Sequence, residues 1–184
     1  MPPFLEIQTR TFNARPTMFA AHKASLAAQT DQDFTHSLLV DDVGRGIGFA
    51  TEQMAAYAPH LVGEYIWILD DDDVCTLPIF VAGLKQIAIL NAPDCIFIRM
   101  DHGAGRILPS ARWGKSPRVG EIGCSAFVVR REVWQAHAHA WTPGCYISDF
   151  NFINSIWQAR PSVYWWDTVA SRVQRQSVGR AEAA

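Results

Sequence analysis

Hydrophobic positions along the chain follow two alternating periods, which predicts strands and helices in turn. Short apolar runs suited to strands are followed by stretches in which apolar residues recur every three or four positions, the spacing of one helix face. The strands are expected at residues 5–9, 37–40, 65–69, 95–98, 125–129 and 163–166. This alternation is typical of an α/β fold with a mostly parallel sheet and right-handed crossovers.

The third expected strand is the most hydrophobic. Residues 65–69 are apolar at every position, as a central strand covered on both faces requires. The next helix is expected to begin near Thr76, which would cap it, with Pro78 in its first turn. Ser148 is expected to cap a later helix in the same way.

The pattern extends over residues 1–173 and predicts one domain, because no repeat or change of composition divides it. Residues 174–184 are expected to form a flexible C-terminal tail. Residues 101–120 are rich in Gly, Pro and Arg and predict an irregular loop. The cations of this loop either meet an anionic ligand or lie on a solvated surface, and the sequence leaves both interpretations open.

Polar side chains follow each of the first three strands, where ligands bind in open α/β sheets. The three segments contain Thr9-Arg10-Thr11 with Asn13 and Arg15, then Asp41 and Asp42, then the run Asp70–Asp73. Carboxylates packed this closely repel one another unless a cation lies among them, and oxygen ligands suit Mg²⁺ or Mn²⁺. The alternative is that these residues form turns and helix caps, but four consecutive aspartates exceed what capping requires.

Composition limits what kinds of molecule the protein is expected to bind and where it is expected to be found. The net charge of −2 gives no overall basic field for nucleic acid. The four cysteines have neither metal-knuckle nor redox spacing. No apolar run is long enough for a membrane span, and no signal peptide is recognisable at the N-terminus. These features together predict a cytoplasmic protein without an integral membrane segment.

Several motifs, taken in order, resemble family 2 glycosyltransferases. Residues Thr11-Phe12-Asn13-Ala14-Arg15-Pro16, Ser25-Leu26, Gln29-Thr30 and Leu39-Val40-Asp41-Asp42 are similar to the opening of that family. Residues 68–73 resemble its Asp-x-Asp segment, and residues 123–132 resemble its later strand ending in Arg-Arg. Ser148-Asp149 stands where the family has Glu-Asp. The resemblance spans residues 4 to 160.

The resemblance implies a GT-A fold and transfer of a sugar, with inversion, from a UDP- or GDP-sugar to an acceptor hydroxyl. It assigns substrate binding to Thr11, Asn13, Arg15, Asp41, Asp42, Asp70 and Asp71. It assigns a Mn²⁺ or Mg²⁺ ion to Asp70 and Asp72, with Asp72 as the principal ligand. It makes Asp149 the general base.

The chain departs from the family pattern at some positions. The Gly-Ser-x-Asp that follows the acidic pair in the family is replaced here by residues 43–46. A late histidine ligand is missing, and Asp167 is either its substitute or a residue of a strand-end turn. Among the tryptophans, Trp67 and Trp157 are expected in the core, whereas Trp113 and Trp141 are candidates for stacking on a sugar.

Two other functions are compatible with the sequence. A haloacid-dehalogenase-type phosphatase would use Asp70 as nucleophile and Asp72 beside it, although about 69 residues precede a motif that normally opens that domain. A non-catalytic GT-A-like domain would bind a sugar nucleotide without turning it over.

Overall fold

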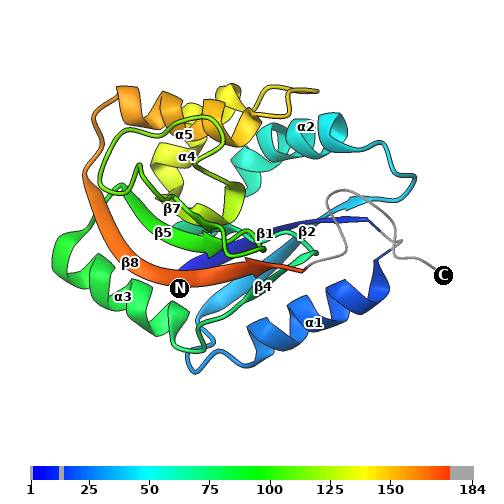
Figure 1. Cartoon of the computed structure of the whole chain (residues 1–184), viewed down its shortest axis with the longest axis horizontal. Coiled ribbons are helices and arrows are strands. Elements are labelled where there is room, and N and C mark those ends of the chain that lie inside the picture. The colour runs from blue at the N-terminus through cyan, green and yellow to red at the C-terminus, as the bar shows by residue number, and fades with distance from the viewer. Residues whose placement is uncertain (1, 13–14, 175–184) are drawn as a thin grey trace.

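The computed structural model describes residues 2–12 and 15–174, which form one sheet with helices on both faces (Figure 1). The strands are β1 (Leu5–Phe12), β2 (Phe34–Asp41), β3 (Tyr65–Ile68), β4 (Asp73–Cys75), β5 (Cys95–Asp101), β6 (Ile107–Leu108), β7 (Phe127–Arg130) and β8 (Val163–Val173). The helices are α1 (Pro16–Ala27), α2 (Ile47–Tyr57), α3 (Phe80–Asn91), α4 (Arg131–His137) and α5 (Ser148–Gln158).

The sheet has the strand order β2-β1-β3-β7-β5-β8-β4, and β6 pairs with β5. Strands β1, β2, β3, β5 and β8 run in one direction, whereas β4, β6 and β7 run against them. The mostly parallel α/β class predicted from the sequence is therefore confirmed. Because β2, β1 and β3 are parallel neighbours, their carboxyl ends meet at one edge of the sheet.

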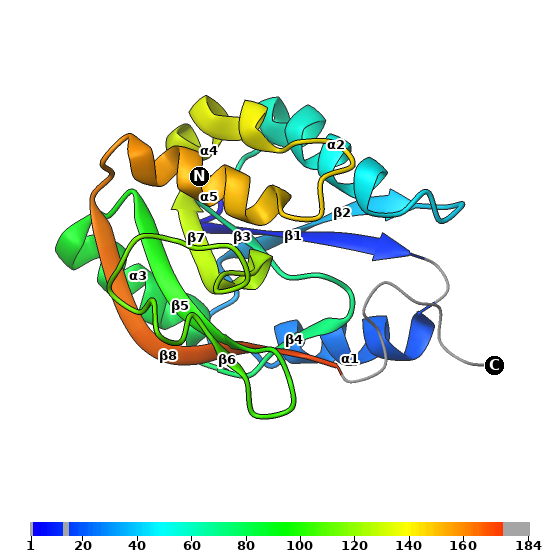
Figure 2. The ribbon, with the colours of Figure 1, turned by 45° about the horizontal axis from the view of Figure 1, so that its top comes forward.

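Helices α1 and α3 lie on one face of the sheet, and α2, α4 and α5 lie on the other (Figure 1, Figure 2). Two hydrophobic cores match these two layers. The core on the α1 and α3 side contains Leu26, Phe80 and Leu84. The opposite core contains Met54, Trp134 and Phe152 from α2, α4 and α5.

Strand β3 separates the two cores. Tyr65, Ile66, Trp67 and Ile68 are all 0% exposed, which confirms the prediction of a strand covered on both faces. The indole nitrogen of Trp67 donates to the carbonyl oxygen of Ser125 at 3.1 Å. The aspartate run therefore begins just after the end of a fully buried strand.

The predicted start of the third helix is wrong. Residues 73–75 form the short strand β4, which pairs antiparallel with residues 171–173 of β8. The Thr76 hydroxyl donates to the carbonyl of Val169 at 2.9 Å instead of capping a helix. Helix α3 begins only at Phe80, with no side-chain cap. The pairing with distant β8 overrides the local capping signal, because a backbone ladder satisfies several polar groups at once.

Two further assignments are corrected. Ser148 is itself the first residue of α5, and its hydroxyl donates to the carbonyls of Thr142 and Cys145 rather than capping the helix. Trp141 is 1% exposed within the core, which excludes it from stacking on a sugar. Trp113 packs edge-on against Trp165, with the Arg99 guanidinium 4.2 Å from the centre of its ring.

Strand β8 is longer than expected because it continues past residue 166 to pair with β4. Its neighbouring tryptophans face opposite layers: Trp165 stacks on Phe97 and Trp166 stacks on Phe80. Gln174, expected to begin the tail, donates its backbone N–H to the carbonyl of Asp72 at 2.8 Å. Residues 175–184 of the expected tail lie outside the described residues. No helix in the described part of the chain is both long and apolar enough to cross a membrane.

A buried carboxylate joins the beginning of β3 to β1 and β2. Glu6 is 0% exposed and accepts hydrogen bonds from the Ser37 hydroxyl and the Val62 N–H, both at 2.7 Å, and from the Gly63 N–H at 3.1 Å. The chain approaches so closely here that a Cβ at position 63 would lie 2.5 Å from the Glu6 nitrogen. Glycine is therefore required at position 63.

We expect Glu6→Ala to lower the free energy of unfolding by about 2–4 kcal/mol, because it leaves buried donors without an acceptor. Urea denaturation followed by circular dichroism measures the change. The matched control is Glu52→Ala on the exposed side of α2, which should change stability by less than about 0.5 kcal/mol. Equal losses in the two variants would show that the Glu6 contacts do not support the fold.

Candidate active site

The three polar segments predicted to converge do so at the carboxyl edge of β1, β2 and β3. Phe12 at the end of β1 pairs with Asp41 at the end of β2. Beyond β3 the chain continues along β1, because the Leu69 N–H donates to the Gln8 carbonyl at 3.0 Å and the Asp71 N–H donates to the Arg10 carbonyl at 3.2 Å. The aspartate run therefore lies beside the segment that follows β1.

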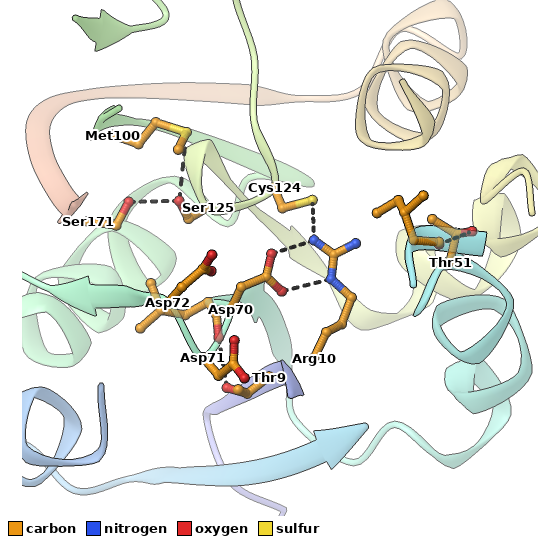
Figure 3. A network of polar contacts seen from close by, with 12 residues as sticks. Thr9, Arg10, Thr51, Asp70, Asp71, Asp72, Met100, Cys124, Ser125 and Ser171 are labelled. Atoms are coloured by element: carbon orange, nitrogen blue, oxygen red, sulfur yellow. Dashed lines mark hydrogen bonds and ion pairs between the residues drawn. The ribbon is translucent and has the colours of Figure 1, made fainter. Parts of the chain in front are cut away.

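Arg10 and Asp70 form a bidentate ion pair at this edge (Figure 3). The Arg10 Nε donates to Asp70 Oδ1 at 2.7 Å, and its Nη2 donates to Asp70 Oδ2 at 2.5 Å. The same Nη2 lies 3.2 Å from the Cys124 sulfur. The exposed fractions of the two side chains are 12% and 21%, so the pair is well shielded from water. A planar guanidinium suits this two-pronged geometry better than an ammonium group.

Arg15 binds the next two aspartates at once. Its Nη2 lies 2.8 Å from Asp71 Oδ1, and its Nη1 lies 2.9 Å from Asp72 Oδ2. Asp71 is 0% exposed and also accepts the Phe12 N–H at 2.9 Å. Burial raises the pKa of Asp71 to about 6, although the bond from Phe12 and the charge of Arg15 act to lower it.

Thr11 and Asp41 shape the loops around this cluster. The Thr11 side chain hydrogen-bonds with Asp71 and is almost fully buried. Asp41 accepts the N–H groups of Gly44 at 3.0 Å and Gly46 at 2.9 Å, which closes the turn before α2. Gly44 has φ of +75°, and a Cβ there would lie 2.9 Å from the Phe12 ring. Asp42 is exposed beside Asp41. Asn13 lies outside the described residues.

Asp149 comes to the same cluster from the first turn of α5. It is half-buried, and its Oδ1 accepts the N–H of Phe150 at 2.7 Å. Burial raises its pKa, while the positive charge of Arg10 lowers it and the negative charge of Asp70 raises it. The carboxyl group of Asp149 therefore lies within electrostatic range of Arg10 and Asp70.

The structure adds a buried carboxyl group that sequence reasoning left unassigned. Asp73, on β4, is 5% exposed and its side chain bonds to Ser125. Burial raises the pKa of Asp73 well above its usual value, and the charges of Asp72 and Asp70 add to the increase. The Ser171 hydroxyl donates to the Ser125 hydroxyl at 2.8 Å (Figure 3). This chain of contacts connects β4 and β8 with the turn that precedes β7.

A second polar cluster supports the aspartate run from the α1 side. The Thr9 hydroxyl donates to the Leu69 carbonyl at 2.8 Å and lies 3.1 Å from His22 Nε2. The His22 Nδ1 lies 3.0 Å from the Asp73 carbonyl, which requires a proton on that nitrogen. His36 Nε2 lies 2.8 Å from the same Thr9 hydroxyl, and burial lowers the pKa of His36 to about 4. His22 is therefore a core residue that holds the backbone of the run.

Other candidates lie in surface contacts. Asp167 forms an ion pair with Arg99, and its side chain is 63% exposed. In the 101–120 loop, Arg106 donates to the Gly120 carbonyl and Arg112 donates to Ser116. These two arginines therefore bind their own loop, which favours the interpretation of a surface loop for them.

The acidic edge suits a metal ion only if a ligand completes the coordination. Among residues 2–12 and 15–174, no group of three or more His, Cys, Asp or Glu side chains is arranged to hold a metal. Mg²⁺ commonly binds one or two carboxylates together with substrate phosphates and water. Asp70 and Asp72 provide hard oxygen donors of this kind, with Arg10 and Arg15 as their present partners. The residues therefore fit a metal that binds together with a phosphate ligand.

The fold is GT-A-like, as comparison with solved structures shows. The structure of S. aureus TarS 1–349 with UDP aligns over 92% of this chain and 60% of that chain, with a TM-score of 0.68 and 14% identity. The complex of TarS 1–349 with UDP-GlcNAc aligns over 98% of this chain and 61% of that chain, with a TM-score of 0.66 and 14% identity. This chain thus spans about three fifths of TarS 1–349.

A197 from STIV is similar in size as well as in fold. It aligns over 97% of this chain and 98% of that chain, with a TM-score of 0.54 and 10% identity. No protein-family model matches the sequence, and no curated protein matches it. At these identities the likeness shows the fold alone.

Because the pKa of Asp71 is raised, replacing Asp71 with asparagine should change the stability of the protein in a pH-dependent way. The folded-state pKa of about 6 exceeds the ordinary value of 3.8, so between these values the folded protein binds more protons than the unfolded chain. Ionisation of Asp71 therefore reduces wild-type stability as pH rises through this window. We expect the stability of Asp71→Asn relative to wild type to increase from pH 4 to pH 6.5 and then level off.

Urea denaturation of both proteins across this pH range measures the difference. Asp31→Asn provides the control, because the pKa of Asp31 is lowered by its hydrogen bond to Lys85 and the sign of its pH effect is opposite. A constant difference between Asp71→Asn and wild type at every pH would contradict the assignment.

Proposed function

We propose that the chain is a glycosyltransferase that moves a sugar from a nucleotide-diphospho-sugar to an acceptor hydroxyl. The observation that carries this proposal is the cluster of Asp70, Asp71 and Asp72 with Arg10 and Arg15 at one sheet edge, within electrostatic range of Asp149. The GT-A-like fold supports it, since the TarS structures with that fold contain UDP and UDP-GlcNAc. A UDP- or GDP-sugar is the proposed donor.

Each part of the edge has a proposed role. Thr11, Asn13, Asp41 and Asp42 would bind the nucleoside, and a carboxylate among them would accept a bond from a base N–H or a ribose hydroxyl. Asp70 would border the ribose and diphosphate. Asp71, predicted to bind substrate, is 0% exposed and would instead hold Arg15 beside them. Asp72, with Asp70, would hold Mn²⁺ or Mg²⁺. When bound, the metal would stabilise negative charge on the departing diphosphate as a Lewis acid.

Asp149 would supply the general base. In an inverting transfer the acceptor oxygen forms a bond to the sugar carbon while the bond from that carbon to the phosphate oxygen breaks. The proton of the acceptor hydroxyl passes to Asp149, and the electron pair of the broken bond remains on the diphosphate. Burial raises the pKa of Asp149, which makes its carboxylate a better proton acceptor than an exposed one.

The phosphatase alternative receives less support from the comparisons. The TarS structures that share this fold contain UDP or UDP-GlcNAc, which favours a nucleotide-sugar ligand over a phosphate ester. Release of phosphate from an aryl phosphate by the wild type, with loss in Asp70→Asn, would favour the phosphatase. Donor binding with neither transfer nor donor hydrolysis would favour a non-catalytic domain.

We predict that Asp149→Asn lowers sugar transfer by about 10² or more, the usual contribution of a positioned base, while donor binding survives. The amide keeps the shape of the carboxyl group and can accept the N–H of Phe150. A thermal-shift screen of nucleotide sugars identifies the donor. The rate is then measured as release of the nucleoside diphosphate with a panel of acceptors and with water.

Asp167→Asn is the matched control, because Asp167 is an exposed acid paired with Arg99. This variant should transfer sugar at the wild-type rate. Near wild-type transfer by Asp149→Asn, with donor affinity retained, would rule Asp149 out as the base.

A further inference from the structure

Arg15 contacts the carboxylate that is proposed to bind the metal ion. Its guanidinium contacts Asp71 and Asp72 together, at 2.8 and 2.9 Å, and its side chain is 11% exposed. The Asp72 carboxylate is the principal proposed ligand of the metal, and one of its oxygens is bound to Arg15. The same carboxylate therefore has two possible cationic partners, one internal to the chain and one from solution.

The charges at this point favour exchange over simultaneous binding. Asp71 and Asp72 carry two negative charges when ionised, and Arg15 neutralises one of them. A divalent ion on Asp72 would place two further positive charges within a few ångströms of the guanidinium, and like charges this close repel strongly in a shielded site. An approaching metal must therefore overcome the attraction between Arg15 and Asp72 as well as this repulsion.

The hydrogen bonding of Arg15 is also incomplete. Its Nε is buried and has no hydrogen-bond partner within the described residues, although a guanidinium can donate five hydrogen bonds. A diphosphate provides several acceptor oxygens for hydrogen bonds. Its negative charge would also offset the repulsion between the Arg15 guanidinium and a bound metal ion. Binding a metal and a diphosphate together would therefore satisfy both cations, whereas binding the metal alone would not.

We propose that Arg15 is an internal counter-ion of Asp72 which excludes free metal and then binds the diphosphate when metal and nucleotide arrive together. The proposal rests on the function proposed above. It makes nucleotide a requirement for tight metal binding. It also assigns to Arg15 a positioning role, since the residue would hold the Asp72 carboxylate in place before the donor binds.

The test is the affinity for Mn²⁺ alone, measured by the electron paramagnetic resonance signal of free Mn²⁺. We expect Arg15→Gln to bind Mn²⁺ about tenfold more tightly than wild type in the absence of nucleotide, because the competing charge is gone. Arg131→Gln is the matched control. It removes the same charge at the start of α4, where Arg131 pairs with Glu132, and should bind Mn²⁺ like wild type.

The second measurement repeats the titrations with saturating UDP. Wild type should gain Mn²⁺ affinity on adding UDP, and Arg15→Gln should gain less, because it lacks the guanidinium that binds the diphosphate. If Arg15→Gln does not fold, Arg15→Met replaces it. Methionine removes the same charge and fills much of the same space, so this variant should also bind Mn²⁺ alone about tenfold more tightly than wild type.

Equal or weaker binding of Mn²⁺ alone by the Arg15 variants, with normal binding in the presence of UDP, would overturn the role of Arg15 and leave the proposed function intact. Failure of wild type to bind Mn²⁺ even with UDP would instead overturn the proposed metal site and this inference with it.

Discussion

The aspartate run after β3 concentrates negative charge where little water can screen it, and the rest of the site depends on how that charge is balanced. Arg10 and Arg15 supply the positive charge, the first through a bidentate pair with Asp70 and the second by bridging Asp71 and Asp72. Without these partners the buried carboxylates would have to take up protons to stay in place. The raised pKa of Asp71 shows that this compensation is only partial.

The sheet fixes the positions of these charged side chains. The parallel pairing of β1 with β2 and β3 places three chain ends at one edge, and β3 is covered on both faces so that its end cannot shift freely. Beneath the run, Thr9 and His22 bind the carbonyls of Leu69 and Asp73. On the other side, Gln174 at the end of β8 donates to the carbonyl of Asp72. The run is thus held by its backbone as well as by its side chains.

Much of this arrangement follows from the sequence because it depends on local pattern. The all-apolar run 65–69 indicates a central strand, and parallel neighbours bring their polar ends together whatever the details of the loops. Strand β4 could not be predicted, since three residues carry almost no periodic signal and its pairing with β8 joins positions about a hundred residues apart. The predicted capping role of Thr76 failed because a distant partner, the Val169 carbonyl, accepts its hydroxyl group. The hydroxyl of Ser148 instead binds the carbonyls of Thr142 and Cys145 in the turn just before α5.

Arg10 and Ser125 illustrate what a single sequence conceals at the site itself. Arg10 lies in β1, where polar residues at positions 6, 8 and 10 alternate with residues 5, 7 and 9. The sequence placed it in the polar segment at the end of the first strand but did not reveal its pairing with Asp70. Ser125 reaches Asp73 only because β7 lies near the site from a position far along the chain. Neither contact can be read from spacing, because each depends on the order of strands in the sheet.

This edge of the sheet is proposed to bind a nucleoside diphosphate among the carboxylates and their arginines. A crystal structure with UDP and Mn²⁺ would show whether it does. The nucleoside is expected beside Thr11 and Asp41 or Asp42, and the diphosphate with its metal at Asp72, with Asp149 facing the space next to it. UDP bound elsewhere on the molecule, or a diphosphate with no metal-mediated or direct contact to Asp70, Asp72 or Arg15, would contradict the proposed site.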